Sequence, residues 1–313
     1  MNPSPQSPMK NQGSRSFMDM TPEQIKEMMS KIEIIPCPEY DGIRWPSFMP
    51  FRIKGAEQAI KEIMALPSRE SDILICTHGK SGTHWIYEII QMLVNKTAEL
   101  DKNVKANTML EVLPDLSILE SLPSPRILDT HFQFQYLPQK HIENRCKIVH
   151  MMRNPKDVIV SLYYHAKKDK MIDLNVEWNE FFEISMDGKF PYGSWYDYEL
   201  GMEQAEKDYP GMIFTSYFED MKSNPEKDIE RLAEFLGVQC NTQMIKDIAK
   251  ATVFENMQKN KFDITALLFG VGFIYRKGEI GDWKNHFTVA QNERFDAQYK
   301  EKMKGSKYSF TFE

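Results

Sequence analysis

Short apolar runs alternate with amphipathic segments along the chain from about residue 70. Four runs have the length of buried strands and are bounded by polar or turn residues: 72–77, 126–130, 146–152 and 211–217. Between and after them, apolar residues recur at helical spacing over 84–94, 154–168, 177–187, 194–207 and 224–237. This alternation predicts an α/β fold, with a central parallel β-sheet flanked by helices on both faces. Because no repeat or linker interrupts the pattern, we expect a single domain.

The first 36 residues follow a different pattern. Residues 1–20 are rich in Ser, Pro, Asn and Gln, a composition that predicts disorder. A short helix is predicted over 21–32, with Thr21 as N-cap, Pro22 at its first position and Gln24 completing a capping box. Its apolar stripe predicts a surface that docks on the main domain. We therefore expect an N-terminal extension over 1–36 and the main domain over 37–313.

Composition and charge narrow the class of protein. The 313 residues are 42% hydrophobic and carry a net charge of -6, without a block of like charge. Nucleic-acid-binding proteins usually carry a basic surface, so this balance argues against that class. The four cysteines are far apart and are expected to be reduced thiols. We find no secretory signal and no apolar run of about 20 residues that would span a membrane, so we expect a soluble cytoplasmic protein.

A glycine-rich turn follows the first predicted strand, in the stretch "CTHGKSGTHWIYEII" over 76–90. A strand that leads through such a turn into a helix presents backbone N–H groups and a positive dipole end to an anion. Lys80 adds a full positive charge. The Walker A pattern of kinases would need glycine at the position of Leu74, and no acidic partner for Mg²⁺ is evident. The turn thus predicts a P-loop-like phosphate site, although these residues alone also fit an ordinary turn with a surface lysine.

Three further stretches are expected at the same edge of the sheet, where the carboxyl ends of parallel strands lie together. His131 follows the run at 126–130, and Arg153 follows the run at 146–152, with Ser161 in the next helix. A compact basic turn contains Arg276, Lys277 and Gly278. Together with Lys80 these cations predict a pocket for a polyanion. On the sequence alone, a histidine such as His131 is more often a packed core residue than a catalytic one.

Three long motifs in the order "KSGTHW", "RNPKDVIVS" and "RKGEIGDWKNHFT" closely resemble those of the cytosolic sulfotransferases. The shorter stretches "PYGSWY", "FEDMKSNP" and "FTVAQNERFDAQY" match as well, and the similarity extends from about residue 37 to the C-terminus. The resemblance implies transfer of a sulfonate group from 3'-phosphoadenosine 5'-phosphosulfate (PAPS) to a hydroxyl or amine of a small acceptor. The product would be adenosine 3',5'-bisphosphate (PAP), and no metal is implied.

The resemblance also implies roles for individual residues. Lys80 would neutralise the leaving oxygen, and His131 would be the general base. The donor would be bound by Lys80, Ser81, Gly82, Thr83, His84, Trp85, Arg153, Ser161, Phe218, Thr252, Phe254, Met257, Arg276, Lys277 and Gly278, of which Trp85 and Phe254 would clamp adenine. The acceptor would contact Trp45, Phe48, Asp129, His131, Tyr164, His165, Tyr192 and Phe273. A homodimer is implied through Lys284, Thr288, Val289 and Glu293.

Several positions depart from the family pattern. His78 and Gly79 replace the usual Tyr-Pro, and His84 replaces a Thr or Asn. Asp129 stands where many members that act on phenols have lysine, and an aspartate would repel an anionic acceptor. The hypothesis that follows is a neutral alcohol, such as a sterol, or an amine as acceptor. A P-loop-type small-molecule kinase and a non-catalytic nucleotide-binding relative are the alternatives.

Overall fold

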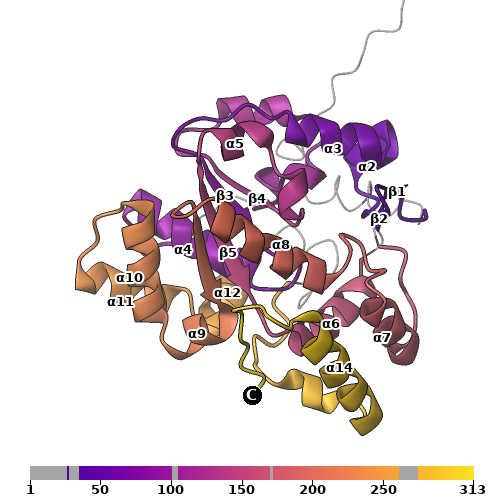
Figure 1. Cartoon of the computed structure of the whole chain (residues 1–313). Coiled ribbons are helices and arrows are strands. Elements are labelled where there is room, and N and C mark those ends of the chain that lie inside the picture. The colour runs from indigo at the N-terminus through magenta and orange to yellow at the C-terminus, as the bar shows by residue number, and fades with distance from the viewer. Residues whose placement is uncertain (1–26, 28–34, 101–104, 170–171, 261–273) are drawn as a thin grey trace, which may run out of the picture.

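A four-stranded parallel sheet lies at the centre of the protein (Figure 1). The structure is a computed structural model that describes residue 27 and residues 35–100, 105–169, 172–260 and 274–313. The strands are β3 (Ile73–Cys76), β4 (Ile127–Thr130), β5 (Lys147–Met152) and β6 (Ile213–Tyr217), in the order β4-β3-β5-β6. Each strand lies within one of the four predicted apolar runs, so the predicted strands are confirmed.

Alternate residues of β3 enter two separate cores, one on each face of the sheet. Ile73 and Ile75 pack with α4 (Thr83–Asn95), α10 (Pro225–Leu236) and α11 (Thr242–Ala251). Leu74 and Cys76 pack with α3 (Ala56–Met64) and α8 (Trp195–Asp208). All four strand residues are buried. The prediction of a parallel sheet covered on both faces is therefore confirmed.

A third core lies beyond the end of β5, where α6 (Pro155–Ala166), α7 (Trp178–Met186) and α14 (Val289–Lys302) pack together (Figure 1). The antiparallel pair β1 (Glu39–Tyr40) and β2 (Ile43–Arg44) was not predicted, because two-residue strands give no periodic signal.

The other helices are α2 (Met49–Lys54), α5 (Gln139–Glu143), α9 (Phe218–Ser223) and α12 (Phe254–Asn260), with 3₁₀ turns η2 (Lys105–Asn107), η3 (Leu110–Val112), η4 (Leu116–Ser121), η5 (Phe134–Tyr136) and η6 (Asp282–Asn285).

Local sequence signals account for the ends of the helices that flank the site. Asn154 caps α6 by accepting from Asp157 N, and Pro155 occupies the first helical position. Gly237 ends α10 with φ 73°, a left-handed conformation that favours glycine. Apart from Glu27, the helix predicted over 21–32 lies outside the described residues, and so does Phe273.

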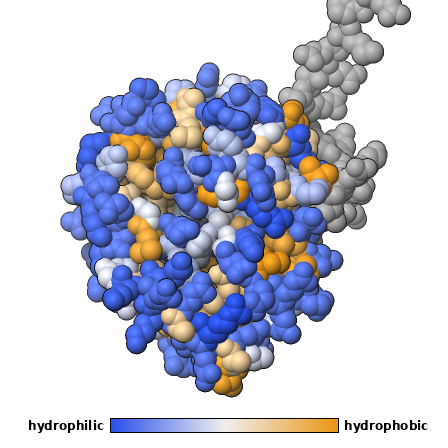
Figure 2. All heavy atoms as spheres, turned by 45° about the vertical axis from the view of Figure 1, so that its right-hand side comes forward, coloured by the Kyte–Doolittle hydropathy of each residue, from blue (hydrophilic) through white to orange (hydrophobic). Residues whose placement is uncertain are grey.

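Hydrophilic side chains dominate the face of the molecule seen in Figure 2, and hydrophobic ones lie singly or in small groups. Among the described residues, Ile53, Val253 and Val289 are the large hydrophobic side chains that are exposed. No helix in the described part of the chain combines the length and the apolar character needed to cross a membrane.

Candidate functional site

The carboxyl ends of the parallel strands bring the predicted site residues to one edge of the sheet. The glycine turn follows β3, His131 follows β4, Arg153 follows β5, and Phe218 follows β6. Because the strands are parallel and adjacent, these four segments are neighbours in space although they span more than a hundred residues of sequence.

The glycine turn has a backbone that only a few residues can adopt. Gly82 has φ 107°, and a Cβ at this position would lie 2.7 Å from Met151 Sδ, so glycine is required there. Lys80 also lies in the left-handed region, with φ 68°. Gly82 is the N-cap of α4, and the turn therefore leads directly into the positive end of a helix dipole. Ser81 is buried, and its Oγ has no hydrogen-bond partner among the described residues.

Lys80 lies among other cations. Burial, together with the nearby charges of Arg153 and Arg276, lowers the pKa of Lys80 to about 8. Its Nζ is 3.5 Å from His165 Nδ1, and His165 Nε2 is 3.4 Å from Asp169 Oδ2. A polyanion at this position would relieve the mutual repulsion of the cations and stabilise the charged form of Lys80.

Arg153 links the basic turn at 276–278 to the glycine turn, because it also donates to Lys80 O at 3.5 Å. Arg153 donates to the backbone oxygen of Glu279 at 2.6 Å and stacks over the ring of Phe218 at 4.4 Å. Arg276 and Lys277 each donate to Asp282 at 2.6 Å. Although burial opposes it, these two hydrogen bonds hold the pKa of Asp282 well below its usual range. The structure thus brings the predicted cations together and shows the carboxylate that orients two of them.

Asp157 connects the start of α6, which follows Arg153, to the segment that follows the basic turn. Sequence reasoning did not identify it as part of the site. Its Oδ2 accepts from Gly281 N at 2.8 Å, and its Oδ1 accepts from Trp283 N at 3.0 Å. The backbone N–H of Asp157 also donates to Asn154 Oδ1, which caps α6. The motif "RNPKD" gave no signal of this role, because an Asp in the first turn of a helix is commonly explained by its interaction with the helix dipole, and its burial is not visible in the sequence.

Each of the two aromatic residues predicted to clamp adenine contacts another residue of the predicted donor site. Trp85 packs edge-on against Phe218, with ring centroids 5.3 Å apart. Phe254 lies against Gly278, where a Cβ would be 2.3 Å from the ring, so this glycine permits the close approach. Met257 is buried, and the buried Thr252 donates its hydroxyl to Ile248 O at 2.9 Å. Thr252 and Met257 are thus packed inside the protein, while Ser161 is half-buried on α6.

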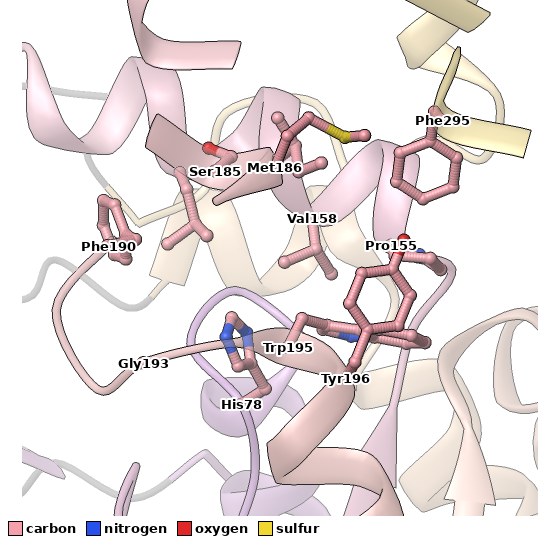
Figure 3. Close-up of a pocket in the computed structure, with 12 residues that line it drawn as sticks. His78, Pro155, Val158, Ser185, Met186, Phe190, Gly193, Trp195, Tyr196 and Phe295 are labelled. Atoms are coloured by element: carbon pink, nitrogen blue, oxygen red, sulfur yellow. The ribbon is translucent and has the colours of Figure 1, made fainter. Parts of the chain in front are cut away.

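His78 lies behind the turn and points into a small cavity between α6, α7 and α8 (Figure 3). The cavity is lined mostly by apolar side chains such as Val158, Trp195 and Phe295. Burial lowers the pKa of His78 to about 4, so the ring is neutral. The departure from the family at position 78 thus changes packing behind the turn. His84, in contrast, is half-buried on the first turn of α4, edge-on to Tyr275.

His131 has the tautomer that a general base requires. Its Nδ1 lies 2.8 Å from the backbone oxygen of Thr77, so Nδ1 carries the proton and Nε2 has a lone pair. Burial, and secondarily the charge of Lys105, lower the pKa of His131 to about 3. The imidazole is therefore neutral at physiological pH and can accept a proton at Nε2.

The residues predicted for the acceptor separate into different environments. Tyr192 lies edge-on to His131, with ring centroids 5.6 Å apart. Tyr164 lies under Arg276, 4.6 Å from its guanidinium, on the side of the basic turn. Trp45 is fully buried in the core against Phe132, and Phe48 is half-buried beside that core.

Asp129 is fully buried and forms an ion pair with Lys105. Thr108 donates a second hydrogen bond to its carboxyl, at 3.2 Å. Sequence reasoning missed Lys105, because the pair is formed between residues 24 positions apart. Lys105 thus compensates the charge of Asp129 within the protein. Asp129 alone therefore does not account for the repulsion of anionic acceptors that the sequence predicted.

Together, the turn, the cations and the neutral imidazole define the class of protein, an α/β transferase that acts on an anionic donor. Comparison with known proteins gives the family. Residues 70–307 match the family model described as "Sulfotransferase domain". Human sulfotransferase 1C2 is 35% identical over 268 residues, which cover 80% of this chain and 90% of the relative. Mouse sulfotransferase 1A1 is 36% identical over 274 residues, covering 82% and 93%. The chain belongs to the sulfotransferase family, as the motifs predicted.

Solved structures agree with this assignment. The mouse sulfotransferase SULT7A1, solved in complex with PAP, is 30% identical and superposes with a TM-score of 0.74. The match covers 87% of this chain and 96% of that one. A retinol dehydratase superposes equally well, with a TM-score of 0.74, but is only 17% identical and therefore supports the fold alone.

Proposed function

We propose that the protein transfers a sulfonate group from PAPS to the hydroxyl or amine of a small neutral acceptor and releases PAP. The observation that carries the proposal is the neutral His131, with its Nδ1 held by Thr77, at the same sheet edge as Lys80 and the glycine turn. The relative SULT7A1, which was solved with PAP, supports the identity of the donor.

Several features of the site fit a donor with phosphates at both ends. Ser81 Oγ, Arg153 Nε and Arg276 Nε are buried polar atoms without partners among the described residues. Ser81 and the first-turn N–H groups of α4 would bind the 5'-phosphosulfate. Arg153, Arg276 and Lys277 would bind the 3'-phosphate, with Ser161 nearby. Trp85 and Phe254 would flank the adenine, as the sequence resemblance implies.

The mechanism needs one proton acceptor and one cation. When bound, the donor supplies an electrophilic sulfur whose leaving group is a phosphate oxygen. His131 Nε2 takes the proton from the acceptor hydroxyl as the acceptor oxygen forms its bond to sulfur. Lys80 neutralises the charge that develops on the phosphate oxygen as the S–O bond breaks. No metal is part of the proposed mechanism.

Several carboxyl groups lie near the acceptor side of the site. Burial is the main cause that raises the pKa of Tyr192, and the carboxyls of Glu111, Asp169 and Asp129 contribute. Lys105 forms an ion pair with Asp129. An acceptor that enters as an anion would approach the carboxyls of Glu111 and Asp169, so the proposal favours neutral alcohols and amines over acidic phenols.

Transfer of labelled sulfonate from PAPS across sterols, alkyl alcohols, amines and phenols tests the proposal. We expect transfer to a neutral acceptor, with the highest kcat/KM among the alcohols or amines. Thermal denaturation with PAP, and separately with ATP and Mg²⁺, distinguishes this function from a kinase, since the ligand that fits the site raises the Tm. Stabilisation only by ATP with Mg²⁺ would contradict the proposal, and a best acceptor that is a small acidic phenol would contradict the acceptor preference.

His131→Ala tests the proposed base and excludes a non-catalytic relative. Loss of a positioned general base should reduce turnover by about 10²- to 10⁴-fold. Binding of PAP should persist, because His131 holds no donor group in this proposal, and the PAP-induced rise in Tm serves as the folding control. Unchanged turnover in the variant would remove His131 from the mechanism.

We further propose a cytoplasmic homodimer, on the resemblance to cytosolic sulfotransferases. The segment that carries the dimer pattern lies on the surface. Thr288 caps α14 in a capping box with Gln291, and Val289 is 77% exposed. Lys284 pairs within the chain with Glu313, and Glu293 is exposed. The division into an extension over 1–36 and a domain over 37–313 likewise stays a prediction.

A further inference from the structure

A short segment between η2 and η3 runs beside β4, which is one of the two outer strands of the described sheet. Asp129 N donates to Thr108 O at 3.0 Å, and Met109 forms a parallel bridge with Asp129. Backbone N–H groups of a strand point to the same side at every second residue. The next outward N–H group along this edge therefore belongs to His131.

Glu111 binds that N–H group with its side chain. Its Oε1 accepts from His131 N at 2.7 Å, in the place where a neighbouring strand would present a backbone oxygen. The carboxyl is fully buried. His131 is thus held at two points, since Glu111 binds its backbone and Thr77 O accepts from its ring.

The same carboxyl oxygen also binds the acceptor side of the site. Tyr192 donates its hydroxyl to Glu111 Oε1 at 3.3 Å, while its ring lies edge-on to His131. Tyr192 has φ 76°, a strained conformation for an aromatic residue, so neighbouring contacts must hold it there. Gln133 donates to Tyr192 O at 3.0 Å and supplies one such contact, and Glu111 supplies another.

We propose that Glu111 is a positioning residue of the active site, which fixes His131 and Tyr192 relative to each other through one carboxyl oxygen. A displacement of about 1 Å in the position of a reacting group can cost about 100-fold in rate. The role in turnover presupposes the proposed sulfonate transfer, whereas the anchoring of His131 does not.

Two substitutions separate positioning from charge. Glu111→Gln keeps an acceptor oxygen but removes the charge, whereas Glu111→Leu removes both. We expect E111L to lower kcat by about 100-fold with the acceptor that the panel selects. The Kd of PAP should stay the same, and E111Q should recover most of the kcat. Wild-type kcat in E111L, an E111Q as inactive as E111L, or an equal loss of PAP affinity would each overturn the proposal.

Glu203→Gln is the matched control, because Glu203 is equally a buried glutamate but bonds to Ser306 and Lys307 N near the C-terminus. It should retain wild-type kcat. If E111L does not fold, Glu111→Asp replaces it, because the shorter side chain withdraws the oxygen while keeping the charge. E111D should then lose kcat, and wild-type kcat in E111D would overturn the proposal.

Nuclear magnetic resonance of protein labelled with ¹³C at histidine Cε1 tests whether Glu111 anchors His131, and it requires no turnover. The His131→Ala spectrum identifies the His131 signal. We expect E111L to shift or broaden this signal and E111Q to leave it in place. If wild-type protein transfers no sulfonate, the proposed function fails, and this spectrum still decides the anchoring. An unchanged His131 signal in E111L would overturn it.

Discussion

At the residue scale, burial decides which groups of the site carry charge. Lys80, His131 and Glu111 lie at one edge of the sheet, and desolvation is the largest cause of the pKa shift of each. Desolvation favours the neutral form of each group. His131 can therefore act as a base, and Lys80 regains its full charge when an anion binds. The sulfotransferase site is therefore prepared for its donor by the low polarity of its surroundings.

Glu111→Gln should make stability less dependent on pH. Burial raises the pKa of Glu111 to about 7 in the folded protein, whereas an unfolded chain has the ordinary value. The folded state thus retains a proton that the unfolded state loses first, and stability falls as pH rises through that interval. We expect E111Q to gain about 2 kcal/mol over wild type between pH 5 and pH 8.

Urea denaturation of both proteins at pH 5, 6, 7 and 8 measures this difference. The gain should grow with pH and level off above pH 7. A stability difference that stays constant across the four pH values would contradict the shifted pKa of Glu111.

At the element scale, the site is assembled by contacts between segments far apart in sequence. Asp157, on the first turn of α6, binds the backbone of the turn that leads to η6. The cations of that turn bind Asp282, at the start of η6, which keeps the basic turn close to Arg153. Helix α6 thus acts as the rigid element against which the basic turn is ordered.

Asp157→Ala should weaken both the fold and the binding of PAP. The variant leaves the N–H groups of Gly281 and Trp283 without their acceptor, and unsatisfied buried groups cost about 1–3 kcal/mol each. We expect a loss of about 3 kcal/mol in stability and about 10-fold in PAP affinity. Calorimetric titration with PAP and urea denaturation measure the two effects.

Asp296→Ala is the control for this prediction. Asp296 also pairs with a residue of α6, Lys156, but its side chain is 52% exposed. Because Asp296 is half-exposed and Lys156 keeps its hydrogen bond to Asn292, the control should change stability by less than about 1 kcal/mol. Equal effects of the two substitutions would contradict the role given to Asp157.

At the scale of the whole molecule, α14 and the C-terminal residues close the third core beside the sheet (Figure 1). Phe295 of α14 is buried in that core, while Val289 at the start of the same helix is exposed. This exposed valine belongs to the surface of the proposed homodimer.

Val289→Glu should convert the proposed homodimer to a monomer. A charge in an apolar contact between identical surfaces would be repeated in both subunits, and like charges brought together repel. Light scattering should give twice 36.7 kDa for wild type and 36.7 kDa for the variant, with Tm unchanged within a few degrees. A monomeric wild type, or a variant that remains dimeric, would contradict the proposed interface.

Much of the fold was encoded in local patterns. The four strands and the helices α4, α6, α7, α8 and α10 were predicted, because the apolar period depends on neighbours in sequence. The cations near the glycine turn were also identified, since the motifs that contain them are contiguous. The β1–β2 pair and the segment beside β4 were missed, because they depend on long-range pairing that no periodic pattern reports.

The sequence by itself determined the sulfotransferase family, the parallel sheet and the turn that holds Lys80. Only the tertiary structure decided the environment of each charge. It placed Lys105 against Asp129, Glu111 under His131, and His78 behind the turn. The physical reason is that hydrogen bonds and desolvation act through space, so the charge state of a residue depends on partners that lie far from it in the sequence.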